Sequence, residues 1–71
     1  MTKEIEKIDA SEPWRAINTF RVGTFKHDFG VTAYTRDYNP CWEGCVEYEV
    51  KAPSGEVAKK AAIAARKKRG D

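Results

Sequence analysis

The 71-residue sequence has little cysteine or histidine, no long apolar run and no internal repeat. No stretch approaches the roughly eighteen apolar residues that a membrane-spanning helix needs. The charged N-terminal stretch does not resemble a secretion signal. We therefore expect an intracellular, cytoplasmic protein with no membrane partner, in which both cysteines stay reduced.

Small size limits what the chain can do. A domain of this length buries only about 60% of the surface that its unfolded chain exposes. Three Phe, three Tyr and two Trp must supply most of the large apolar side chains of a thin core. A deep substrate pocket does not fit such a domain, so we expect a protein that is not an enzyme and uses no cofactor.

Cys41 and Cys45 come nearest to a metal-binding or nucleophile motif. Their spacing is C-x3-C, and His27 with Asp28 or Asp37 could complete a set of four ligands. Structural zinc sites usually show a second well-spaced ligand pair, which this sequence lacks. A Cys–His nucleophile would also need a substrate cleft and an oxyanion hole. The sequence therefore predicts no metal site and no catalytic residue.

Three segments have the residue pattern of β-strands. β-Branched and aromatic residues flank the turn KHDFG, which predicts a hairpin with strands at about 19–26 and 30–37. Residues 45–52, CVEYEVKA, alternate between apolar and polar side chains, as in a strand with one buried face. The intervening DYNPCWEG contains turn-forming residues and predicts a loop.

The N-terminal region gives weaker signals. Residues 1–12 are mostly charged and are predicted to be a tail or a frayed helix turn. Ser11 and Pro13 form a helix-start signal, which predicts a short helix over about 12–18. The predicted domain organisation is thus a tail over 1–12 and one small domain over 13–71.

The segment SGEVAKKAAIAARKKRG, residues 54–70, predicts an amphipathic helix with Ser54 as its N-cap. Projection at about 100° per residue separates an apolar side from a basic side. Residues assigned to the apolar side are Val57, Ala58, Ala61, Ala62, Ala64 and Ala65. Those assigned to the basic side are Lys59, Lys60, Arg66 and Lys67, with Ile63 among them. We expect the apolar side to cover the sheet.

These elements together predict the fold class. We expect an α+β domain with a three-stranded antiparallel meander, covered on one face by the C-terminal amphipathic helix. A short N-terminal helix would precede the first strand.

The basic side of the helix is the first candidate site. Residues 54–71 carry six basic and two acidic side chains, against seven basic and nine acidic in the rest of the chain. Such a dipolar surface steers polyanions, and lysines and arginines neutralise phosphates. We therefore predict a small binding protein that contacts nucleic acid or a ribonucleoprotein. The predicted contact residues are Lys59, Lys60, Ile63, Arg66 and Lys67.

At Lys59, Lys60 and Ala62 the helix resembles the last helix of the double-stranded RNA-binding domain, over about a quarter of the chain. The resemblance implies that lysines at the start of this helix contact phosphates. The sequence departs from the family pattern at Ile63, which stands at a lysine position, and at residues 66–67, which replace an alanine pair. We infer no membership from it.

Aromatic and charged residues around the central loop form a second candidate site. Tyr, Trp and Arg are enriched at the hot spots of protein interfaces. In this alternative the chain is a single-domain inhibitor or adaptor, of the kind that phages and mobile elements encode, and it binds one target protein. The predicted contact residues are then Tyr34, Arg36, Tyr38, Trp42, Glu47 and Glu49. The aromatics could also stack bases, but the two carboxylates would repel phosphate. The oligomeric state stays open.

Overall fold

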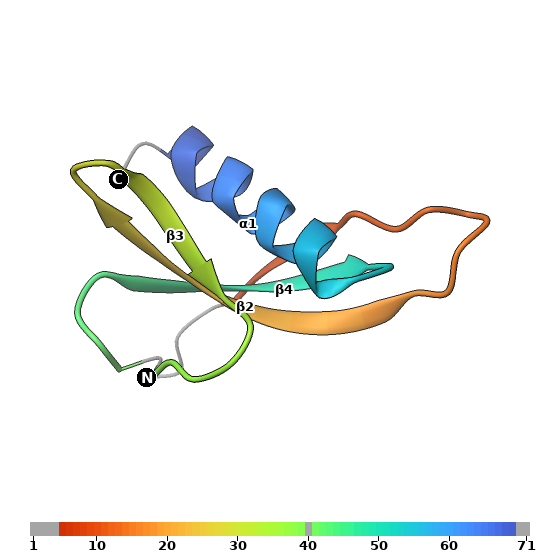
Figure 1. The fold of residues 1–71 in the computed structure, drawn as a ribbon, viewed down its shortest axis with the longest axis horizontal. Helices are drawn as coiled ribbons and strands as arrows, with labels where there is room; N and C mark the ends of the chain where they lie inside the picture. The colour runs from red at the N-terminus through yellow and green to blue at the C-terminus, as the bar shows by residue number, and fades with distance from the viewer. Residues whose placement is uncertain (1–4, 40, 70–71) are drawn as a thin grey trace.

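The computed structural model describes residues 5–39 and 41–69. Its elements are β1 (Glu6–Asp9), β2 (Asn18–His27), β3 (Gly30–Tyr34), β4 (Cys45–Ala52) and α1 (Gly55–Arg69). The strands form one sheet in the order β1-β4-β2-β3, and α1 lies across one face of it (Figure 1). We call this face the inner face and the opposite one the outer face. The predicted small α+β class is confirmed.

The strand order corrects the predicted meander. A meander would place β4 beside β3, but β4 pairs antiparallel with β2 along its whole length. β2 is ten residues long and pairs through its C-terminal half with β3 on its other edge. Because β2 has two edges, the pattern along the chain cannot show which edge takes the last strand. β3 and β4 therefore lie on opposite sides of β2, and residues 35–44 connect them.

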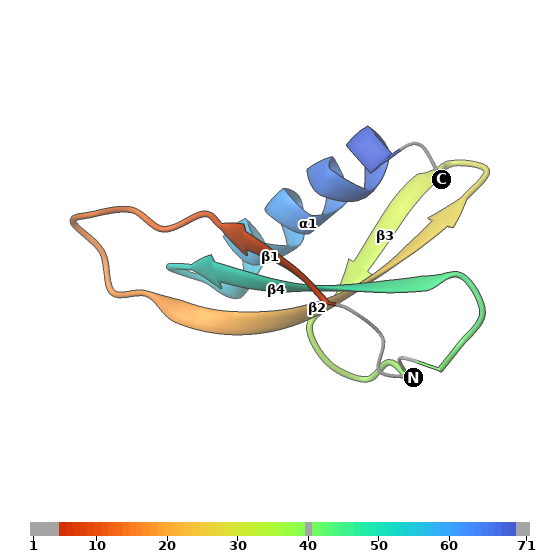
Figure 2. The same ribbon diagram turned by 180° about the vertical axis from the view of Figure 1, so that it is seen from behind.

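β1 is a fourth strand, which the sequence does not predict. It pairs in parallel with the free edge of β4 (Figure 2), with Glu6 opposite Tyr48. Ile8 packs against the core, and the Ala10 amide donates to the Lys51 carbonyl at 2.7 Å. Residues 6–9 lie within the predicted tail. Only one large apolar residue in these four faces the core, so the alternation is too short to indicate a strand.

The predicted short helix over 12–18 does not form. The Arg15 amide donates to the Glu12 carbonyl at 3.2 Å, which closes a single turn. The chain then leads into β2, which begins at Asn18. The helix-start signal is followed by Ile17 and Thr19, whose β-branched side chains favour the extended conformation.

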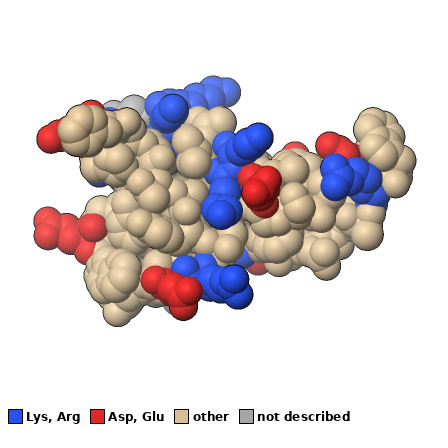
Figure 3. Space-filling view, viewed as in Figure 1, with Lys and Arg blue, Asp and Glu red and all other residues tan. Residues whose placement is uncertain are grey.

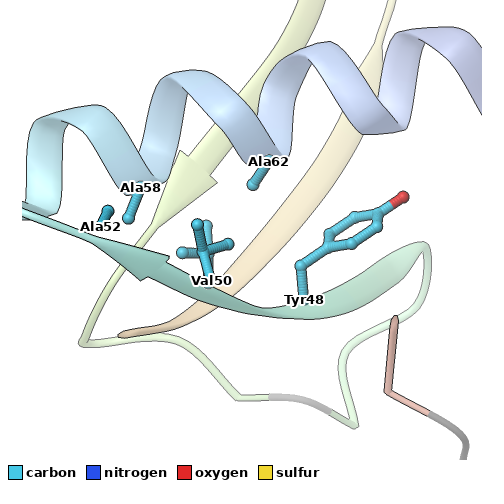
Figure 4. Close-up of a cluster of buried hydrophobic side chains, with 6 residues drawn as sticks. Tyr48, Val50, Ala52, Ala58 and Ala62 are labelled. Carbon is cyan, nitrogen blue, oxygen red and sulfur yellow. The ribbon is translucent and has the colours of Figure 1, made fainter. Parts of the chain in front are cut away.

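The core lies between α1 and the inner face (Figure 4). Its fully buried residues are Val22, Tyr48, Val50, Ala52, Ala58 and Ala62. The small alanines let the helix backbone approach the sheet closely, and the strands supply the larger side chains. The helix begins as predicted, because the Val57 amide donates to Ser54 Oγ at 3.4 Å.

In the parts of the chain that the structure describes, no helix combines the length and the apolar character needed to cross a membrane.

Candidate functional site

Arg66 does not belong to the exposed basic face of α1. It is only 5% exposed, and it continues the buried stripe formed by Ala58 and Ala62. Residues four apart differ by only about 40° around a helix, so Arg66 stays on the side that faces the sheet. The sequence-based projection assigned helix residues by their polarity, so it put the alanines on the buried side and Arg66 on the exposed side. Arg66, one of the predicted nucleic-acid contacts, is therefore buried against the sheet and not displayed on the exposed side of α1.

The exposed face of α1 differs from the predicted one in other residues too. Lys60 and Lys67 are exposed, as predicted, but Lys59 and Ile63 are half-buried. Ala64, which was predicted to face the sheet, is exposed. Ile63 therefore lies at the boundary of the packed face and is not an isolated apolar residue among cations.

The charges on the helix side of the molecule are dispersed. Figure 3 shows Lys and Arg side chains in several separate groups, with acidic side chains beside some of them. A polyanion gains affinity from each phosphate that is neutralised. Separate small groups provide fewer such contacts than one continuous basic patch would.

On the outer face, Tyr38 anchors the segment that connects β3 to β4. Its ring lies so close to Gly23 that a Cβ there would be 2.5 Å from the ring atom Cε2. The Tyr38 hydroxyl donates to Glu47 Oε2 at 2.7 Å, and the same oxygen lies 3.8 Å from Arg21 Nη1. Burial, followed by the hydrogen bond to this carboxylate, raises the pKa of Tyr38 well above its ordinary value. The hydroxyl therefore remains a donor.

Three aromatic residues, Phe25, Tyr34 and Trp42, pack together on the outer face, and we call them the aromatic cluster. Phe25 meets Tyr34 edge to face, with ring centroids 5.7 Å apart, and lies 6.0 Å from the Trp42 ring. Tyr34 is 43% exposed and Trp42 is 53% exposed. The Trp42 amide donates to the Asn39 carbonyl at 2.9 Å. The strands β2 and β3 and the anchored connection thus present a partly exposed aromatic surface.

The six residues of the predicted protein-binding patch have different roles in the structure. Tyr34 and Trp42 belong to the aromatic cluster, and Arg36 is exposed. Tyr38 and Glu47 form the anchor described above. Glu49 Oε2 lies 3.9 Å from Lys7 Nζ, so its charge is partly compensated.

Two aromatic residues at the hairpin end were missed from the sequence. Phe25 alternates with the inner residues of β2, which puts it on the outer face together with Tyr34 of β3. The strand period could have revealed this position once the register was known. Phe29, which the sequence assigned to a turn, is 97% exposed.

The cysteines and the histidine do not assemble into a reactive group. Cys41 is exposed, Cys45 is buried, and His27 Nε2 lies 2.7 Å from Thr32 Oγ1. Among the described residues, no group of three or more His, Cys, Asp or Glu side chains could hold a metal ion.

A depression of ≈ 360 Å³ lies between β1 and the last turns of α1. Its lining residues are Glu6, Lys7, Ile8, Ala65, Lys68 and Arg69. It is open to solvent and combines cations with one carboxylate, and it contains no nucleophile paired with a base.

Comparison of the chain with protein-family models, with curated proteins and with solved structures gives no match.

Proposed function

We propose that the protein binds one target protein through the aromatic cluster and acts as an inhibitor or adaptor. The observation that supports this proposal is the packing of Tyr34 and Trp42 on Phe25 while both remain about half exposed. Aromatic side chains dominate binding energy at protein interfaces. Residues that are already fixed lose little conformational entropy on binding, which favours affinity.

The charges around the cluster are compatible with a protein partner. The ion pairs of Glu47 with Arg21 and of Glu49 with Lys7 compensate the acidic row of β4. Phe29 is exposed in the turn of the β2–β3 hairpin, and Arg36 provides an exposed donor group. An apolar centre with a polar rim is typical of protein interfaces.

Affinity capture with a matched tryptophan control tests the proposal. Trp42→Ala should abolish retention of the target, whereas Trp14→Ala should not. Trp14 is 79% exposed and lies in the connection between β1 and β2, at the end of the sheet opposite the hairpin (Figure 1). Both variants should keep the circular dichroism spectrum of the wild type. Equal retention by wild type and Trp42→Ala would show that the cluster is not the interface.

Nucleic-acid binding by α1 is a second candidate. It is favoured by Lys60 and Lys67, which are exposed two helical turns apart, with exposed Lys68 next to them. A double Lys60→Glu, Lys67→Glu variant should lose binding to mixed-sequence RNA or DNA at low salt. A Lys26→Glu, Lys51→Glu variant makes the same charge change at exposed strand positions and should lose less. No detectable binding by the wild type at low salt, where electrostatic affinity is greatest, would exclude this candidate.

A further inference from the structure

Arg66 and Tyr48 carry buried donor groups without a partner among the described residues. Nε and Nη1 of Arg66 are enclosed and make no hydrogen bond to the described chain, and the Tyr48 hydroxyl is in the same situation. A buried charge without a counterion is strongly unfavourable.

The two groups lie in the same layer of the molecule. Figure 4 shows the Tyr48 hydroxyl projecting past Ala62, beneath the following part of α1. Arg66 is four residues after Ala62 on the same buried stripe, about 6 Å further along the helix axis. Both donors therefore lie between the C-terminal half of α1 and the sheet.

On the inner face, the three longest strands carry no carboxylate that could pair with Arg66. In β2, β3 and β4, which are described throughout, every Glu points to the outer face, because the buried Tyr48 and Val50 alternate with Glu47 and Glu49. Glu6 of β1 lies opposite Tyr48 in register, but it is exposed and makes no ion pair with Arg66.

The last turn of α1 is rich in basic side chains. Arg66 is followed by Lys67, Lys68 and Arg69 in the last turn of α1. The carbonyl groups at the helix C-terminus favour cations there, but they are neutral dipoles and leave the net positive charge in place. Glu6 lines the depression beside Lys68 and Arg69 and offsets part of this charge, but cations still outnumber carboxylates there.

We propose that Arg66 and Tyr48 bind a single oxyanion group, a phosphate or a carboxylate, between α1 and β4. An oxyanion accepts hydrogen bonds from a guanidinium in bidentate geometry and accepts a further one from a phenol. It thereby satisfies both unpartnered groups and compensates the charge of Arg66. This site is distinct from the aromatic cluster, so either proposal can fail without the other.

Thermal unfolding in different sodium salts tests this site. At matched ionic strength and pH, we expect inorganic phosphate or acetate to raise the unfolding midpoint in a saturable way relative to chloride, because a ligand that binds the folded state stabilises it. If only phosphate raises the unfolding midpoint, the site binds phosphate. If acetate raises it, the site binds a carboxylate. Arg66→Gln should abolish the rise, and Tyr48→Phe should weaken the apparent affinity about tenfold.

The double variant Lys60→Gln, Lys67→Gln is the matched control, because it removes two exposed charges from the same helix. It should keep the anion effect. If Arg66→Gln does not fold, the Arg66 Nε–H resonance of the wild type gives the answer, since it should shift on titration with phosphate or acetate. No saturable effect in the wild type, an unmoved Nε–H resonance, or an effect that depends on Lys60 and Lys67 would each overturn the proposal.

Discussion

At the scale of single residues, Gly23 controls how the β3–β4 connection lies on the outer face. Gly23→Ala places a methyl group within 2.5 Å of the Tyr38 ring, so the ring must move. We expect a loss of about 1–3 kcal/mol in the free energy of unfolding, which is the usual cost of overpacking. Urea denaturation measures it, and binding of the target should weaken because Trp42 belongs to the displaced segment.

The Tyr38→Ala background provides the control for Gly23→Ala. With the ring removed, the nearest atoms that a methyl group at Gly23 would meet are gone, so the double variant should lose little more stability than Tyr38→Ala alone. The interaction energy of this double-mutant cycle isolates the contact between the two residues. Additive effects of the two substitutions would contradict this account of the anchor.

Asp9, at the end of β1, makes part of the stability dependent on pH. The Ser11 hydroxyl donates to Asp9 Oδ1, and the Ser11 amide donates to the same oxygen at 3.0 Å. These hydrogen bonds favour the carboxylate and lower the pKa of Asp9 below its ordinary value. Their contribution is present above the unfolded-state pKa of about 3.9. It is lost as the pH falls through the lower folded-state pKa.

An NMR titration of the Asp9 carboxyl carbon checks this. Its midpoint should lie below the ordinary aspartate value in the wild type and move back toward it in Ser11→Ala. An unchanged midpoint in the variant would show that the hydroxyl contributes nothing.

At the scale of elements, the rotational phase of α1 decides which alanines accept a larger side chain. Ala62 is fully buried, whereas Ala64 is exposed. Ala62→Leu should therefore cost about 1–3 kcal/mol through overpacking. Ala64→Leu should change stability by less than about 0.5 kcal/mol, as surface substitutions usually do. Chemical denaturation of both variants measures the difference in the free energy of unfolding. Similar losses in the two variants would contradict the observed rotation of α1 about its axis.

The same element shows how far residue patterns predict structure. The helix and its Ser54 cap follow from local signals, because capping and periodicity depend on neighbouring residues. The burial of Arg66 does not follow from them, since a hydrophobicity-based projection places every arginine toward solvent. Packing against the sheet determines the rotation of α1 about its axis, because the side chains of the helix must fit in size against those of the strands.

At the scale of the whole molecule, the sheet order predicts a gradient of local stability. β2 and β4 are central, whereas β1 and β3 are edge strands. Hydrogen exchange should be slowest for amides at the centres of β2 and β4, near Val22 and Val50, and faster in β1 and β3. Edge strands are exposed to local opening that does not require unfolding of the core. Equally slow exchange in β1 and β4 would contradict this order.

The aromatic cluster is likewise a product of the whole fold. Tyr34 and Trp42 were recognised as candidates from the sequence by residue type. Phe25 joins them because β2 and β3 pair in one particular register, and Trp42 reaches them because the connection crosses the outer face. The first relation lies within one hairpin, whereas the contact of Trp42 joins segments that no local pattern relates.

Local signals along the chain are sufficient to predict three features: the β2–β3 hairpin, the alternating strand β4 and the capped helix α1. The position of β4 beside β2, the parallel addition of β1 and the burial of Arg66 depend on how distant segments pack together. The physical reason is that propensity, capping and periodicity act between neighbouring residues. The choice of a strand edge and of a buried helix face depends on surfaces that meet only when distant segments pack together.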